Sequence, residues 1–148
     1  MGLQRSIDLQ PGGAGRWETM TLIQIQRGDA KAALATARRE PPGVWRDIAE
    51  TLALQIGPDP AAAEVALKEL IDNHGGIAPY QIAQAQALRR DPDAMFHWLD
   101  KARVGRDSAL ETLLVDPILM RYRNDPRMAV FCTKIGLPPP SQSQTRGI

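Results

Sequence analysis

The sequence predicts an all-α fold in which helical hairpins stack into a right-handed superhelical α-solenoid, closed by a C-terminal capping helix. Two observations predict this fold. Ile48-Ala49 returns as Ile82-Ala83 after 34 positions, and a repeat period of about 20 to 50 residues is typical of solenoids. The apolar residues also recur at a spacing of three or four, as on one face of a helix, and no segment shows the alternation of a half-buried strand.

The first elements are a helical remnant and one hairpin. Residues 3–9 precede Pro11 and read as the last turns of a second helix whose first helix is missing. A helix is expected at about 16–27, because four of its residues recur at i, i+3, i+4 and i+7 on one face; they are Trp17, Met20, Thr21 and Gln24. A second, short helix carries Ala33 and Ala37. It must end before Pro41-Pro42-Gly43, which cannot continue a helix.

Two further hairpins follow the same plan. The next first helix repeats the earlier spacing with Trp45, Ile48, Ala49 and Leu52. Its second helix begins at Asp59-Pro60, an N-cap followed by proline, and its inner stripe is Ala63, Leu67 and Leu70. The third hairpin uses Ile82 and Ala83, the cap-plus-proline pair Asp91-Pro92, and the stripe Met95, Leu99 and Ala102.

The C-terminal part breaks into shorter helical pieces at 108–115, 118–123 and 128–135. Asp116-Pro117 and Asp125-Pro126 mark two of their starts. The last piece carries one apolar face suited to covering the end of a solenoid: Met128, Phe131, Cys132 and Ile135. The predicted segments are a remnant helix at 1–11, hairpins at 12–103, short capping helices at 104–137 and a disordered tail at 138–148.

Composition excludes several classes of function. Lys and Arg number 18 against 17 for Asp and Glu, a net charge of +1, so charge does not suggest nucleic-acid binding. The single Cys132 fits a reducing compartment and excludes an intrachain disulfide. No apolar run approaches the roughly 18 residues of a membrane span, and we expect neither a membrane partner nor a cofactor.

With these residues in view, the chain resembles tetratricopeptide repeat (TPR) proteins over residues 3–138. It is most similar to the C-terminal repeat region of bacterial regulatory and signalling proteins, where the repeats follow a winged-helix DNA-binding domain, a cyclase or a kinase. The matching stretches are Phe96-His-Trp-Leu-Asp-Lys-Ala102, Arg106-Asp107, Val115-Asp-Pro117, Asn124-Asp-Pro-Arg127 and Gly136-Leu-Pro138. The resemblance implies a cytoplasmic sensing or docking region of a larger protein.

The resemblance also implies where a partner binds, because the first helix of each repeat lines the concave groove in that family. Carried over by position, the groove residues are Glu18, Thr19, Leu22, Arg46, Asp47, Glu50, Tyr80, Gln81 and Gln84. The family's clamp for peptide carboxylates needs Lys, Arg and Asn on these faces. Only Arg46 qualifies, so anchoring through a C-terminal carboxylate is not expected.

The remaining candidate residues favour structure over chemistry. His74 and His97 have no second ligand at metal-binding spacing, and His74 near Asp72 suggests a capping arrangement at a helix end. Trp17, Trp45 and Trp98 fall at core positions of the repeat, and Cys132 lies on an apolar stripe. We find no catalytic motif.

The predicted function is therefore a scaffold for protein or peptide binding. Self-association is the alternative, as a homodimer through the N-terminal edge that carries Leu3, Ile7 and Leu9. An enzyme without a recognisable motif is the third hypothesis.

Overall fold

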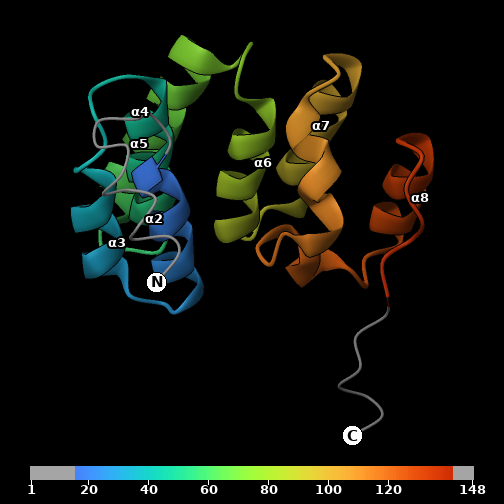
Figure 1. Ribbon diagram of the computed structural model, residues 1–148, viewed down its shortest axis with the longest axis horizontal. Coiled ribbons are helices and arrows are strands. Elements are labelled where there is room, and N and C mark those ends of the chain that lie inside the picture. Colours follow the sequence, from blue (N-terminus) through green and yellow to red (C-terminus); the bar gives the residue numbers. More distant parts are fainter. Residues whose placement is uncertain (1–15, 142–148) are drawn as a thin grey trace, which may run out of the picture. The chain divides into compact units, whose positions relative to one another are not determined.

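The computed structural model describes residues 16–141. The predictions for residues 3–9 and for the end of the tail, 142–148, lie outside this part. The described residues form helices and no strands, which confirms the all-α class. With the labels of Figure 1, the helices are α2 (Arg16–Gln26), α3 (Ala30–Ala37), α4 (Val44–Gln55), α5 (Pro60–His74), α6 (Pro79–Leu88), α7 (Pro92–Val104), the 3₁₀ helices η1 (Ser108–Val115) and η2 (Leu119–Tyr122), and α8 (Pro126–Lys134).

The chain divides into two compact units, the first ending at Ile77 and the second beginning at Ala78. In the first unit α2 packs against α3 and α4 packs against α5, each pair joined by a short turn. Helix α4 also packs against both α2 and α3. Figure 1 shows these pairs in the blue to green part of the chain. This unit therefore contains two helical hairpins.

The core of the first unit is built from the predicted stripes. Ile48, Ala49 and Leu52 of α4 are buried, and so are Ala33 and Ala37 of α3. Helix axes approach to about 8–10 Å, and small side chains at the contact favour the short end of that range. The alanines therefore explain how α4 can pack against two helices at once.

A buried acidic residue joins the two helices of the first hairpin. Glu40, just beyond α3, accepts a hydrogen bond of 3.0 Å from the backbone N–H of Trp17 in the first turn of α2. An anion stabilises a helix N-terminus, because the first N–H groups have no partner within the helix. Arg39 places its guanidinium 4.1 Å from the centre of the Trp17 ring.

The expectation that the three tryptophans lie in the core is wrong. Trp17, Trp45 and Trp98 are each half-buried. The Trp17 ring carries Arg39 on one face, and the Trp98 ring has the Lys101 ammonium 5.4 Å from its centre. So large a ring rarely loses all contact with solvent, and cations cover part of the Trp17 and Trp98 rings.

In the second unit α6 packs against α7 as the third predicted hairpin, drawn in yellow-green to orange in Figure 1. The pieces predicted at 108–115 and 118–123 form 3₁₀ helices, η1 and η2, which pack against each other, and η2 also packs against α6. A 3₁₀ helix is usually a short piece, as η2 is with 4 residues, whereas η1 with 8 residues is longer than most.

The acidic caps are confirmed. The side chains of Asp59, Asp91 and Asp125 each accept a hydrogen bond from a backbone N–H in the first turn of α5, α7 and α8, and a proline follows each of them. Helix α8 buries Met128, Phe131 and Cys132 as predicted, and burial raises the pKa of the Cys132 thiol. It ends before Gly136, whose φ of +80° is the left-handed conformation that glycine adopts without strain.

Candidate binding groove

A groove of about 560 Å³ lies along α4 and α5 in the first unit. Binding sites for small ligands typically enclose about 300 to 1,000 Å³. Helix α4 lines it with Asp47, Glu50, Thr51 and Leu54; the loop and α5 line it with Asp59, Ala61, Ala62, Val65, Ala66, Glu69, Leu70 and Asn73.

The spacing of the lining residues shows why the groove runs along the helices. On α5 they follow one another by one and three positions from Ala61 to Asn73, which is one continuous face of a helix. This face spans 12 residue steps, about 18 Å at the helical rise. Its floor is made of small and apolar side chains, and Val65 is 56% exposed there. The groove therefore offers an open apolar surface of helical length.

Carboxylates form the rim. Glu50 pairs with Arg38 at 3.0 Å and with Arg46 at 3.5 Å. Asp47 lies 2.9 Å from Nε2 of His74 at the end of α5, so the suggested arrangement of His74 with Asp72 is replaced by a contact between α4 and α5. The lining includes four carboxylates and no Lys or Arg. Its chemistry is acidic around an apolar centre.

The predicted groove residues fall into three groups. Asp47 and Glu50 line this groove, and Arg46 reaches it through its pairing with Glu50. Glu18, Thr19 and Leu22 lie on α2 and do not line it; Thr19 is exposed and the other two are half-buried. On α6, Gln81 is half-buried, whereas Tyr80 and Gln84 are buried.

Tyr80 and Gln84 are engaged inside the second unit. The Tyr80 hydroxyl donates to Oδ2 of Asp116 at 2.6 Å, and the Gln84 amide donates to the same atom at 2.9 Å. The other oxygen of Asp116 accepts from the backbone N–H groups of Ile118 and Leu119 at 2.9 and 3.3 Å. Burial and the Asp116 carboxylate raise the pKa of Tyr80, which keeps the phenol protonated as a donor. These side chains hold α6 to the segment between η1 and η2.

Sequence reasoning missed the α5 side of the groove. The prediction took binding residues from the first helix of each hairpin, whereas α5 is a second helix and supplies Ala62, Val65, Ala66 and Glu69. A signal was present in the sequence. The alternation of small, apolar and acidic residues at this spacing leaves one face of α5 apolar outside the stripe of Ala63, Leu67 and Leu70.

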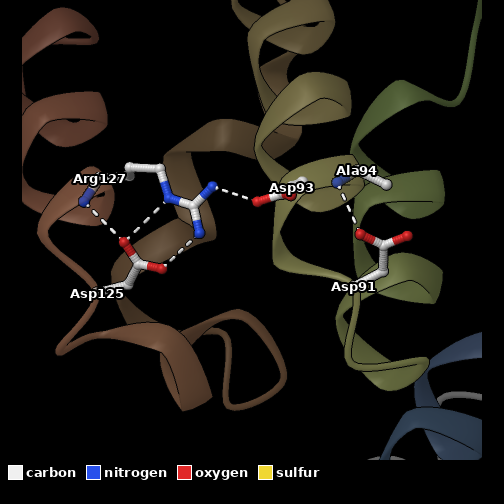
Figure 2. A network of polar contacts seen from close by, with 5 residues as sticks. All are labelled: Asp91, Asp93, Ala94, Asp125 and Arg127. Carbon is white, nitrogen blue, oxygen red and sulfur yellow. Dashed lines mark hydrogen bonds and ion pairs between the residues drawn. The ribbon is translucent and has the colours of Figure 1, made fainter.

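A smaller, mostly apolar groove of about 310 Å³ lies in the second unit between α7 and α8, lined by Phe96, Asp100, Pro126, Arg127, Val130, Phe131 and Lys134. Figure 2 shows the polar network beside it. Arg127 donates to Asp125 at the start of α8 and, at 2.7 Å, to Asp93 of α7. Asp91 accepts from the Ala94 N–H in the same view. Hydrogen bonds from Arg127 hold the pKa of Asp125 below its ordinary value.

This cap gives a test of α8 stability. Replacing Asp125 with alanine should lower the free energy of unfolding by about 1 kcal/mol at pH 7, because the α8 N-terminus loses its acceptor. Since the folded-state pKa of Asp125 is depressed, its stabilisation is present above about pH 4 and is lost as the pH falls further. Thermal unfolding followed by circular dichroism should thus show a difference between the two proteins that shrinks from pH 7 to pH 2.

Asp125→Asn is the matched control, because asparagine still caps but carries no charge for Arg127. The difference in stability between Asp125→Asn and Asp125→Ala should therefore change little with pH. An Asp125→Ala protein that is as stable as the parent at pH 7 would contradict the cap's role.

Within residues 16–141 no group of three or more His, Cys, Asp and Glu side chains is placed to hold a metal ion. In the same part of the chain, no helix combines the length and the apolar character needed to cross a membrane. Comparisons with protein-family models, with curated proteins and with solved structures find no match to this chain.

Proposed function

We propose that this chain is a protein-binding scaffold of stacked TPR-like hairpins and that the α4–α5 groove receives a segment of another protein. The groove itself carries the proposal: it is open, its floor is apolar and its length matches a helix or a short peptide. In the scaffold we propose, the hairpins continue as a right-handed superhelix and serve as the docking region of a bacterial regulatory or signalling protein. The packing of α4 against both α2 and α3 supports this stacking.

The chemistry of the groove favours binding over catalysis. Its lining has no serine, cysteine or lysine nucleophile, and the Thr51 hydroxyl donates to the backbone oxygen of Ala66. Two of its carboxylates are already engaged: Glu50 pairs with Arg38, and Asp47 lies within hydrogen-bond distance of the His74 ring. An apolar surface surrounded by charged groups is the usual composition of a protein-binding site.

A selection of random peptides against the immobilised chain tests the proposal. Selected peptides should bind the parent protein with micromolar affinity in fluorescence anisotropy. They should bind Val65→Lys at least tenfold more weakly, because this change removes the exposed apolar residue at the groove's centre.

The control is Val104→Lys, which makes the same change at a valine that is 70% exposed on α7. It should bind the selected peptides like the parent. The proposal fails if no peptide is enriched, or if the enriched peptides bind the Val65 and Val104 variants equally well.

A further inference from the structure

We infer that the segment received by the α4–α5 groove is an amphipathic helix that carries lysine or arginine beside its apolar face. This inference rests on the proposed function and narrows it to one class of partner. Three observations lead to it: a neighbouring example of a helix seated on a hairpin, the shape of the groove and the charge of its rim.

Within the first unit, one helix already packs against a helical hairpin, as the proposed partner helix would. Helix α4 is seated against both helices of the α2–α3 hairpin, and Ala33, Ala37 and Ala49 are fully buried in that region. A hairpin that places small residues at the contact can thus pack against a third helix. The α4–α5 hairpin has such residues on its groove side, namely Thr51, Ala61, Ala62 and Ala66.

The dimensions favour a helix over an extended chain. The lining of α5 is about 18 Å long, and α4, with 12 residues, has the same length. Leu54, Val65 and Leu70 lie among the small residues of the lining, and an apolar stripe at helical spacing would contact this surface. The groove is bordered by helices, so it offers no free strand edge to which an extended segment could add its backbone hydrogen bonds.

The carboxylates at the rim of the groove favour a positively charged partner. Asp59 lies at one end of the groove and Glu69 toward the other, and no ion pair of Glu69 occurs among residues 16–141. Arg38 and Arg46 offset part of the charge on Glu50, and the Asp47 carboxylate already contacts the His74 ring, so Glu69 is the carboxylate most available to a ligand. A cation on the bound helix would complement it, and complementary charge chiefly sets specificity and association rate.

The probe is an acetylated and amidated peptide of leucine and lysine with helical spacing, labelled for fluorescence anisotropy. We expect saturable binding that weakens with added salt. A peptide with glutamate in place of lysine should bind at least tenfold more weakly. A lysine peptide with a central proline, which cannot form a continuous helix, should lose a similar factor.

Charge reversal within the protein completes the test. Glu69→Lys should weaken binding of the lysine peptide about tenfold and improve binding of the glutamate peptide. Glu111→Lys makes the same charge change at an exposed residue of η1, outside the groove, and should behave like the parent.

Other outcomes would overturn this inference while leaving the proposed function intact. Equal binding of the lysine and glutamate peptides would remove the charge preference, and equal binding of the proline peptide would indicate an extended ligand. In both cases peptides selected from the random library would still lose affinity for Val65→Lys. A dimer in light scattering that dissociates with Val65→Lys would instead make the occupant a second copy of the chain.

Discussion

Replacing Asp116 with alanine is expected to destabilise the second unit by about 3 to 4 kcal/mol. The substitution leaves the buried Tyr80 hydroxyl and Gln84 amide without their acceptor, and each orphaned buried group costs about 1–3 kcal/mol. It also removes the acceptor of the Ile118 and Leu119 N–H groups. So large a loss is a substantial part of the 5–15 kcal/mol that holds a typical domain folded.

Urea unfolding followed by tryptophan fluorescence measures this effect. In a background of Trp17→Phe and Trp45→Phe, Trp98 of α7 alone reports on the second unit. Tyr80→Phe provides the graded control, because it removes one donor and leaves Gln84 bound to Asp116; we expect about half the loss. If Asp116→Ala unfolds at the same urea concentration as the parent, the network does not hold α6 to this segment.

Replacing Leu52 with alanine should cost about 2 to 5 kcal/mol in the first unit. Leu52 has an exposed fraction of 0% on α4, the helix that packs against α2, α3 and α5. Loss of its buried methyl groups combines the transfer free energy with the cost of a cavity, because three neighbouring helices can close it only in part.

Leu54→Ala is the control that distinguishes the loss of a core leucine from the loss of a groove leucine. It removes the same atoms two positions later, from a half-buried side chain that lines the groove, so its cost should be about 1 kcal/mol. Fluorescence of Trp45, with Trp17 and Trp98 changed to phenylalanine, follows unfolding of this unit. Equal losses for the two leucine variants would show that α4 does not bury the face assigned to it.

The α5 side of the groove shows the limit of prediction from sequence. Asp47 and Glu50 were predicted because the resemblance placed the first helix of each hairpin at the binding face, and both line the groove. Val65 and Glu69 were not predicted, because the exposure of a helix face depends on which neighbours cover it. The residues of α5 show that this face is apolar, but only the packing of the other helices decides that it stays uncovered.

The sequence by itself determined the helices and their ends. Repeated spacing of apolar residues set the buried faces of α4 and α5, and Asp-Pro pairs such as Asp59-Pro60 set helix starts, because a cap acts on N–H groups only a few residues away. Only the tertiary structure decided the partners of the polar groups. Asp116 reads locally as a cap, yet it also accepts hydrogen bonds from side chains 32 and 36 positions earlier. Such contacts form only when distant segments pack, and no local pattern encodes them.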